Sequence, residues 1–297
     1  MKYKLLVGML LLGVTLLQAQ SVKVTKKSAL TLSGAYPVLN QQGDALLISS
    51  SNYKGLNYYD LKSNTYFAVT EDQGAGYNPV IGKEQILFQS NKFENGRKFS
   101  AVKSYDIQRK STAEILPFSR EVKQLSSLGN TVQVTSDSKP LKSIRNFTVS
   151  QRSVITKNGK IILINGNQQK ELNPVKEARN GYLWVSLSPK GDKILFTAAG
   201  LNTYIMDLNG KIVSNLGRVE APEWYNENWI VGMLTKDDGH TITASDIRMV
   251  STDGNEVILI SDTTEIAMYP SAAGQAGKVA YATADGKVFV LDLTINR

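Results

Sequence analysis

The sequence predicts an all-β protein, folded as a six-bladed β-propeller of four-stranded antiparallel blades. Apolar runs of about five residues alternate with clusters of Gly, Asn, Asp and Ser along the 297-residue chain. After residue 20, no stretch keeps apolar residues at helical spacing for long, so we expect almost no helix. A motif that joins two such runs recurs roughly every forty residues, which is a period typical of propeller blades.

The N-terminal residues 1–19 are predicted to be a signal peptide that precedes a propeller domain at residues 20–297. Lys2 and Lys4 come before thirteen uncharged, mostly apolar residues at 5–17, and Ala19 offers a small residue for cleavage. Thirteen residues are too few to span a bilayer, which takes about 20. An uncleaved N-terminal anchor is the alternative. We therefore expect a periplasmic or secreted protein with no transmembrane segment. A lipoprotein is not expected, because the chain has no cysteine to carry the lipid.

The recurring motif has a fixed spacing. Residues 36–46 align with residues 184–194 without a gap, and seven residues separate Leu39 or Leu187 from the first apolar residue of the following run. Six such anchor residues occur, at spacings of 42, 44, 62, 37 and 48 residues: Leu39, Ile81, Leu125, Leu187, Trp224 and Ala272. Six anchors favour six blades over five or seven.

The two ends of the chain are predicted to close the ring together. An alternating segment at residues 22–32 precedes the first anchor, and the last unit has room for about three strands after Ala272. We expect this N-terminal strand to join the last blade, which would remove an exposed sheet edge.

The unit that starts at Leu187 resembles a known repeat. It reads Leu-Ser-Pro-Lys-Gly-Asp-Lys-Ile-Leu-Phe-Thr to Thr197 and continues with Tyr-Ile-Met-Asp-Leu-Asn-Gly over residues 204–210. This is similar to the WD40-like (PD40) repeat of the TolB propeller family, with leucine in place of an aromatic residue and lysine in place of an aspartate. The resemblance implies a six-bladed propeller exported to the envelope of a Gram-negative bacterium. The separate domain that TolB carries ahead of its propeller has no counterpart in the residues before Leu39, so its role with the Tol–Pal system does not carry over.

Aromatic residues gather just before the anchors. Tyr36, Tyr77, Trp184 and Tyr269 are candidate ligand-binding residues, because the strand that starts at each anchor motif is expected to begin at the mouth of the central channel. Their rings would offer flat stacking surfaces to a sugar or a peptide. The alternative is that they fill the interfaces between blades.

The third unit is longer than the others and basic. Its excess lies around residues 136–152 and contains four cations that are candidate contacts for an anionic partner: Lys139, Lys142, Arg145 and Arg152. Residues 83–180 hold 18 Lys and Arg against 8 Asp and Glu, which would steer anions towards this region. We predict a basic protrusion that binds an acidic glycan, a lipopolysaccharide phosphate or an acidic protein. A solvated connection is the alternative.

The composition excludes several chemistries. Without cysteine, and with His240 as the single histidine, thiolate metal sites, cysteine nucleophiles and histidine-rich metal centres are excluded. The segment around His240 reads as a hairpin turn. Glu223 and Glu227 flank Trp224, but nothing in the sequence places the two carboxylates opposite each other. We therefore predict no catalytic residue, no cofactor and no metal.

These observations favour a non-catalytic binding or scaffold module of the cell envelope. Its partner would be an envelope protein, a peptide or a glycan, including anionic ones, and the protein would act as a monomer. Nucleic acid is disfavoured by export, despite the formal net charge of +8. The alternative is a propeller enzyme that acts on carbohydrate, either a glycoside hydrolase or a polysaccharide lyase.

Overall fold

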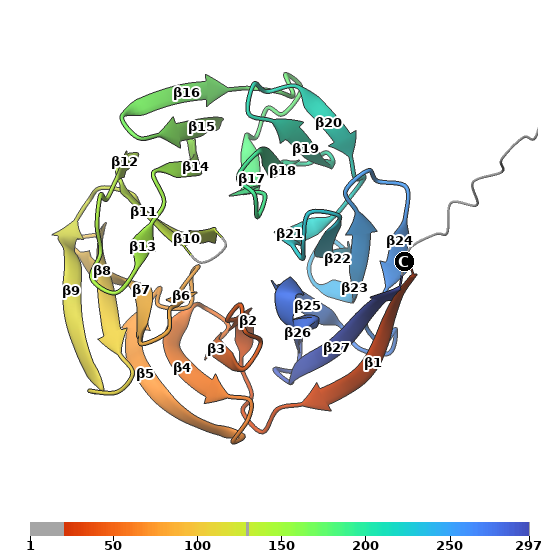
Figure 1. Ribbon diagram of the computed structural model, residues 1–297, viewed down its shortest axis with the longest axis horizontal. Coiled ribbons are helices and arrows are strands. Elements are labelled where there is room, and N and C mark those ends of the chain that lie inside the picture. Colours follow the sequence, from red (N-terminus) through yellow and green to blue (C-terminus); the bar gives the residue numbers. More distant parts are fainter. Residues whose placement is uncertain (1–20, 129–130, 297) are drawn as a thin grey trace, which may run out of the picture.

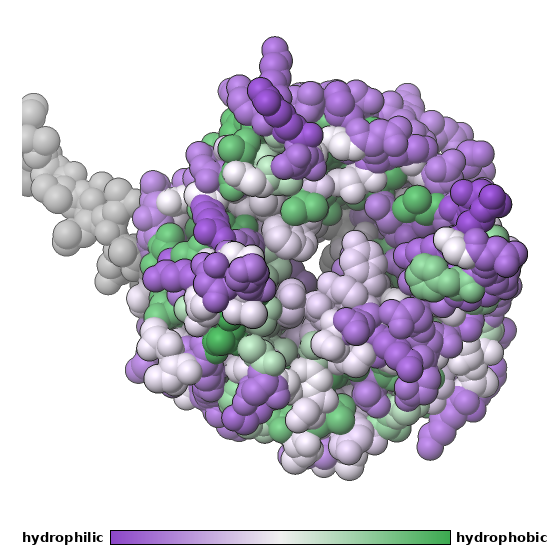
Figure 2. All heavy atoms as spheres, turned by 180° about the vertical axis from the view of Figure 1, so that it is seen from behind, coloured by the Kyte–Doolittle hydropathy of each residue, from purple (hydrophilic) through white to green (hydrophobic). Residues whose placement is uncertain are grey.

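The computed structural model describes residues 21–128 and 131–296, and these residues form seven β-sheets arranged as blades around a central axis (Figure 1). The prediction of six blades is therefore wrong. The predicted signal peptide at residues 1–19 lies outside the described residues. A space-filling view shows an opening at the centre of the ring (Figure 2).

Five blades have four antiparallel strands each. Blade 1 contains β2 (Ala35–Leu39), β3 (Ala45–Ser49), β4 (Lys54–Asp60) and β5 (Thr65–Gln73), and blade 2 contains β6 (Val80–Ile81), β7 (Gln85–Glu94), β8 (Arg97–Asp106) and β9 (Ser111–Ser119). Blade 5 contains β17 (Tyr182–Leu187), β18 (Lys193–Ala198), β19 (Thr203–Asp207) and β20 (Ile212–Asn215). Blade 6 contains β21 (Glu220–Trp224), β22 (Trp229–Asp237), β23 (Ile242–Ser251) and β24 (Val257–Leu259). Blade 7 contains β25 (Ala267–Ala273), the short 3-10 helix η1 (Gly274–Ala276), β26 (Lys278–Thr283), β27 (Val288–Asn296) and β1 (Ser21–Ala29).

Blades 3 and 4 are irregular. Blade 3 contains β10 (Lys123–Leu128), β11 (Thr131–Ser136), β12 (Lys139–Pro140) and β13 (Thr148–Val149), and β13 pairs with β11 in parallel. Blade 4 has three strands: β14 (Arg152–Lys157), β15 (Lys160–Asn165) and β16 (Gln168–Leu172). The segment at residues 136–152 is therefore no insertion into one unit, because it holds the outer strands of blade 3 and the start of blade 4.

Chain direction defines two faces of the ring. We call the face at which the innermost strands β2, β6, β10, β17, β21 and β25 begin the top face, and the opposite face the bottom face. Because neighbouring strands are antiparallel, the turn between the second and third strands of each blade also lies at the top face. The loop that enters the next blade lies there too.

Blade 4 lacks the innermost strand that the other blades have. At one end of β14, the guanidinium of Arg152 donates to the carbonyl of Gly191, in the bottom-face turn after β17 (2.9 Å). At the other end, Gly159 packs against Gly181, just before β17 begins at the top face. Hence β14 runs opposite to β17, in the direction of a second strand, and blade 4 has no strand that runs from top to bottom next to the axis.

The N-terminal strand completes blade 7. Strand β1 pairs with β27 over eight residue pairs, from Ser21 opposite Asn296 to Ala29 opposite Phe289. The side chain of Val22 is buried with Leu291 and Leu293, and the Lys27 ammonium lies 4.2 Å from the centre of the Phe289 ring. The last strand of the chain is thus covered by the first.

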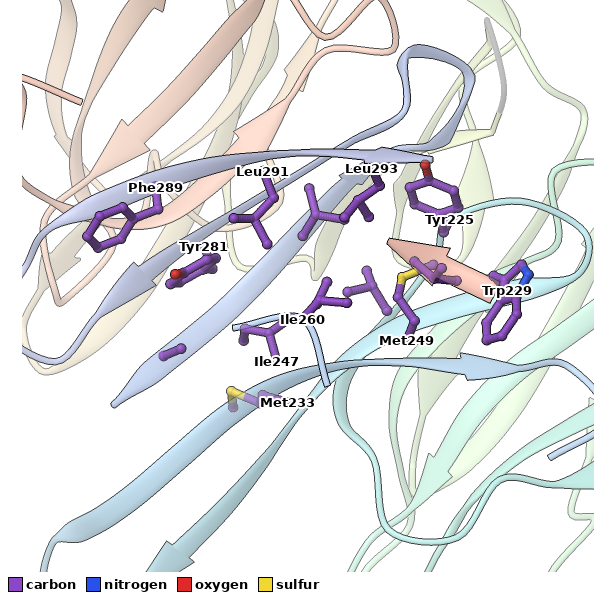
Figure 3. Packing of buried hydrophobic residues seen from close by; sticks show 14 residues of the cluster. Tyr225, Trp229, Met233, Ile247, Met249, Ile260, Tyr281, Phe289, Leu291 and Leu293 are labelled. Carbon is purple, nitrogen blue, oxygen red and sulfur yellow. The ribbon is translucent and has the colours of Figure 1, made fainter. Parts of the chain in front are cut away.

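The core is divided among the interfaces between blades. The largest cluster joins blades 6 and 7: Trp229 and Met249 come from blade 6, and Tyr281 and Leu291 come from the facing sheet of blade 7 (Figure 3). Second strands such as β3 and β18 have apolar residues buried on both faces, because each blade is covered on two sides. A blade in the ring therefore depends on its neighbours for burial of its apolar surface.

Three positions before five of the six anchors, the residue has a left-handed backbone conformation with positive φ. Tyr36, Asn78, Trp184, Ala221 and Tyr269 have φ between 44° and 53°. In four of these strands the register shifts at this point, as in a β-bulge. In four of the five cases proline is the next residue. The repeat seen in the sequence is therefore a bend that starts each innermost strand.

This backbone conformation predicts an unusual order of stability at Tyr36. A side chain at positive φ costs about 1–2 kcal/mol, whereas glycine loses about 0.5–1 kcal/mol more backbone entropy than alanine on folding. Tyr36→Gly should therefore be about 0.5 kcal/mol more stable than Tyr36→Ala in urea unfolding. Ala113, exposed in strand β9, is the control, because Ala113→Gly should instead lower stability by about 0.5–1 kcal/mol. If Tyr36→Ala is as stable as Tyr36→Gly, the positive φ at position 36 does not strain the backbone.

Candidate functional site

Four tyrosines from blades 7, 1 and 2 meet at the top face. The rings of Tyr36 and Tyr53 stack with centres 3.9 Å apart, and the Tyr269 ring lies 4.3 Å from Tyr36 on the blade 7 side. Tyr77 meets Tyr53 edge to face at 5.4 Å. Three of the four predicted aromatic residues are thus brought together by a further ring, Tyr53, which was not predicted because it lies in the turn between β3 and β4, outside the repeated motif.

Three phenols of this tyrosine cluster, those of Tyr36, Tyr53 and Tyr269, are weaker acids than a free tyrosine. Burial is the largest cause that raises the pKa of Tyr36, Tyr53 and Tyr269. The pKa of Tyr269 reaches about 12, because the neighbouring Tyr36 phenol also favours its neutral form. Tyr36, Tyr53 and Tyr269 are therefore uncharged at neutral pH and contribute apolar surface and hydroxyl groups.

Within the cluster, ring faces differ in accessibility. The Tyr36 ring has Tyr53 and Tyr269 as ring neighbours, so it joins blade 7 to blade 1 and has little free face. Tyr77 is 48 % exposed at the edge of the cluster. Tyr77 is thus the member best placed to meet a ligand, whereas Tyr36 packs between blades.

Trp184 lies in blade 5 and outside the tyrosine cluster. It is 43 % exposed, at the bend near the start of β17, and its neighbour Leu183 is also exposed. Leu201, in the turn between β18 and β19 of the same blade, is exposed too. The top of blade 5 therefore offers three large apolar side chains to solvent.

Exposed apolar side chains are unevenly distributed over the ring. Among the described residues, those at the top face form what we call the exposed apolar set: Tyr77, Phe93, Val122, Leu183, Trp184 and Leu201. The other large exposed apolar residues lie on outermost strands: Tyr66, Val213, Val257 and Leu259. None of the described large apolar side chains is exposed in a bottom-face turn.

Two hairpins extend the top face. Strands β7 and β8 pair over ten residues and β22 and β23 over nine, whereas the equivalent strands of blades 5 and 7 pair over five. Four or five further residues extend a strand by about 13–17 Å. The hairpin of blade 2 carries Phe93, 66 % exposed, near its tip. The hairpins therefore present side chains beyond the plane of the other turns.

The four predicted basic residues do not form one patch. Lys139 is at the top-face end of β12, and Lys142 and Arg145 follow in the loop that leads to the bottom face, all three exposed. Arg152 is half-buried and bonds to the carbonyl of Gly191 in blade 5. Arg152 thus connects two blades, and only the other three are free to meet a partner.

Glu223 and Glu227 point to different neighbours. The backbone N–H of Ala272 on β25 donates to Glu223 Oε2 (3.1 Å), so Glu223 reaches blade 7. The backbone N–H of Lys190 donates to Glu227 Oε1 (2.7 Å), so Glu227 reaches blade 5. The two carboxylates therefore do not form the facing pair that glycoside hydrolysis needs.

Glu223 has an unusual environment for a carboxylate. It lies on the innermost strand of blade 6, where the residue is exposed to solvent although nearby protein atoms desolvate its carboxylate. This partial burial is the main cause that raises its pKa to about 7, against the N–H of Ala272, which lowers it.

The raised pKa predicts a dependence of stability on pH. The folded state binds a proton at Glu223 more tightly than the unfolded state does. Protonated Glu223 therefore makes its full contribution to the free energy of unfolding below about pH 4.5, and this contribution is lost as pH rises to about 7. Glu223→Gln keeps the acceptor for Ala272 and removes the charge. It should stabilise the protein at pH 8 by about 1 kcal/mol, allowing for solvent screening, and have little effect at pH 4.5. Thermal unfolding of the two proteins at pH 4.5 and pH 8 measures the effect of the substitution. An equal effect at both pH values would contradict the raised pKa of Glu223.

The hairpin around His240 is a structural turn. The Asp238 carboxylate accepts the backbone N–H groups of His240 (2.9 Å) and Thr241 (2.8 Å). Across residues 21–128 and 131–296, no three side chains of the His, Asp and Glu type come close enough together to bind a metal ion. The same residues include no helix long and apolar enough to cross a membrane.

Solved structures show which known proteins share this fold. A crystal structure of TolB from Acinetobacter baumannii superposes on 81 % of this chain with a TM-score of 0.50 and 20 % sequence identity. The chain has a TolB-like propeller fold. It spans only 56 % of the length of that TolB chain, so the likeness concerns the propeller and not the whole of TolB.

A weaker likeness concerns an enzyme. A crystal structure of oligogalacturonate lyase from Vibrio parahaemolyticus superposes on 86 % of this chain and 76 % of its own, with a TM-score of 0.47 and 9 % identity. Comparisons with protein-family models and with curated proteins find no match. What the comparisons show is therefore a TolB-like propeller fold.

Proposed function

We propose that the protein is a non-catalytic binding module of the cell envelope, and that a partner protein docks on the top face of the propeller. The observation that carries this proposal is the exposed apolar set, which lies on one face of the ring, whereas no large apolar side chain is exposed in a described bottom-face turn. Exposed apolar groups on one face of a soluble fold are typical of protein interaction sites.

The geometry of the top face supports a protein partner more than a single sugar. The side chains of the set are spread over blades 2, 3 and 5 and the loop after blade 1, so one small ligand would not touch them all. A standard protein interface involves about 20–30 residues on each side, with a few large apolar or aromatic anchors. Trp184 and Tyr77 are the aromatic candidates for such anchors.

The envelope location of the proposal rests on the sequence of the first nineteen residues, with a basic start and an apolar stretch. The basic half of the ring, formed by blades 2 to 4, would favour a partner with an acidic surface. The protein would be periplasmic or secreted and monomeric when free.

A capture experiment tests the proposal. The chain from residue 20, immobilised, is exposed to envelope extract at low and high salt, and retained proteins are quantified. Trp184→Ala with Leu201→Ser should reduce capture of the specific partner at least tenfold, because an anchor residue contributes about 2 kcal/mol or more. Val213→Ser is the matched control, since Val213 is exposed on the outer strand of blade 5.

Two results would overturn the proposal. One is capture that responds equally to the top-face and the outer-strand substitutions. The other is turnover of a polysaccharide by the purified protein, which would support a carbohydrate enzyme instead.

A further inference from the structure

A polar cavity lies at the bottom face, between blades 2 and 3. It has a volume of about 210 Å³ and lies between the ends of blade 2 strands and the loop that joins β12 to β13. Its lining consists of charged and amide side chains: Glu84, Gln85, Asp106, Gln108, Arg109, Arg145 and Asn146. It is on the opposite side of the ring from the exposed apolar set.

Two fixed turns form the walls of this cavity. On blade 2, the Asp106 carboxylate accepts the backbone N–H groups of Gln108 (3.1 Å) and Arg109 (2.8 Å), which holds the turn after β8. On blade 3, Ile144 and Phe147 close a turn through a backbone hydrogen bond of 3.1 Å. Both apolar side chains belong to the core between blades 2 and 3, so Arg145 and Asn146 are the residues left to line the cavity.

Phe147 holds the turn of blade 3 against blade 2. A methyl group added at Gly82, in the turn before β7, would lie 2.5 Å from the Phe147 ring, so the ring packs directly on the glycine backbone. The positive φ of Asn146, 65°, is typical of asparagine in a tight turn. The cavity is therefore built from anchored backbone, which reduces the ordering cost of binding.

The two arginines of the cavity are available to a ligand. Among the residues that the structure describes, no carboxylate oxygen lies within 4.0 Å of the guanidinium of Arg109 or of Arg145. Asp106 has its Oδ1 committed to its own turn. Guanidinium groups bind carboxylate and phosphate groups by paired hydrogen bonds.

The remaining lining suits hydroxyl groups. Glu84 and Asp106 add two negative charges, so a bare anion gains little net attraction from the cavity. Carboxylate and amide oxygens accept hydrogen bonds from hydroxyls, and the amides of Gln85, Gln108 and Asn146 can also donate. A ligand with one acidic group and several hydroxyls would use both sets.

We propose that this cavity is a binding site for a small polyhydroxylated ligand that carries one oxoanion group, either a phosphate or a carboxylate. Arg109 and Arg145 hold the oxoanion, and the carboxylates and amides hold the hydroxyls. This site is separate from the top-face docking surface and does not depend on it.

Titration of the purified chain with four probes tests the site, followed by calorimetry or by amide chemical shifts. Glucose 6-phosphate and glucuronate distinguish the two oxoanions, whereas glucose and inorganic phosphate carry each half of the chemistry alone. We expect at least one of the two anionic sugars to bind with Kd below 1 mM, as an order-of-magnitude value. That sugar should bind at least threefold more tightly than glucose or inorganic phosphate, because only it engages both halves of the cavity.

Matched arginine variants make the result specific. Arg109→Ala and Arg145→Ala should each weaken binding of the anionic sugar at least tenfold, which corresponds to about 1.4 kcal/mol. Arg97→Ala removes the same charge from the blade 2 hairpin at the opposite face and should change affinity less than twofold. Thermal unfolding confirms that each variant is folded.

Three outcomes would overturn the site. The first is absence of binding by both anionic sugars at 5 mM, a probe concentration of the order expected to saturate a millimolar site. The second is glucose or inorganic phosphate binding as tightly as the anionic sugar that binds best, and the third is equal weakening by all three arginine variants. The last would mean non-specific attraction to a basic surface. None of these outcomes depends on whether a protein docks on the top face, so the two proposals can fail independently.

Discussion

Removal of strand β1 should lower the free energy of unfolding by about 5 kcal/mol and promote association between molecules. Eight residue pairs connect β1 to β27, and a backbone hydrogen bond contributes about 1 kcal/mol. Without β1, strand β27 presents an unpaired edge at the outside of blade 7, and such edges pair with other chains. Chemical unfolding and light scattering of a chain that begins at residue 30 measure both effects.

Point substitutions on β1 separate the role of the strand from that of chain length. Val22 is buried against Leu291 and Leu293, whereas Lys23 is exposed. Val22→Asp should therefore cost about 2 kcal/mol or more, because it buries a carboxylate, while Lys23→Asp should cost less than about 0.5 kcal/mol. Equal effects of the two substitutions, or a truncated chain as stable as the full one, would mean that β1 adds little to the ring.

The propeller could be predicted from the sequence because its repeat marks a physical requirement. All six anchors lie on innermost strands, and five of the six are preceded by a residue with positive φ. The bend needs particular residues at fixed distances from the first apolar residue of the next strand, so it leaves a detectable spacing. Only Leu125 lacks the left-handed residue, since Val122 does not have a positive φ.

The number of blades was predicted wrongly for the same reason. Blade 4 has no innermost strand, so it has no bend and no anchor. Its three strands fall within the interval of 62 residues between Leu125 and Leu187, where the sequence suggested a basic insertion. The length of that interval was the sequence feature that indicated a seventh blade. A count of apolar runs, such as Ile161–Ile164, would have detected blade 4, whereas a count of anchors did not.

The candidate site could be predicted only in part, because aromatic spacing gives position along a strand but not contact between rings. Tyr36, Tyr77 and Tyr269 precede anchors, whereas Tyr53 lies in the turn between β3 and β4, outside the repeated motif. That turn lies at the face where β2 begins, which follows from antiparallel pairing within the blade. Arg145 and Arg109 line the same cavity because blades 2 and 3 are neighbours and because one turn of blade 3 is anchored. A single sequence shows neither feature.

Trp229→Ala should be the most damaging single substitution in the ring, with a loss of about 3–5 kcal/mol. The side chain of Trp229 is fully buried in the cluster between blades 6 and 7, beside Met249 and Tyr225 (Figure 3). Because neither blade can cover its own apolar face, a cavity here weakens the contact that holds the two together. The thermal midpoint should fall by on the order of 10 °C, measured by circular dichroism so that loss of a fluorophore does not disturb the signal.

Trp184→Ala provides the matched control for this prediction. The same side chain is removed, but Trp184 is half-exposed at the top face, so stability should change by less than about 0.5 kcal/mol. A loss at Trp229 below about 1 kcal/mol would mean that packing between blades is not the main source of stability. A large loss at Trp184 would mean that this tryptophan is part of the core, and its use as an anchor for a partner would then fail as well, because a residue needed for folding is not free to bind.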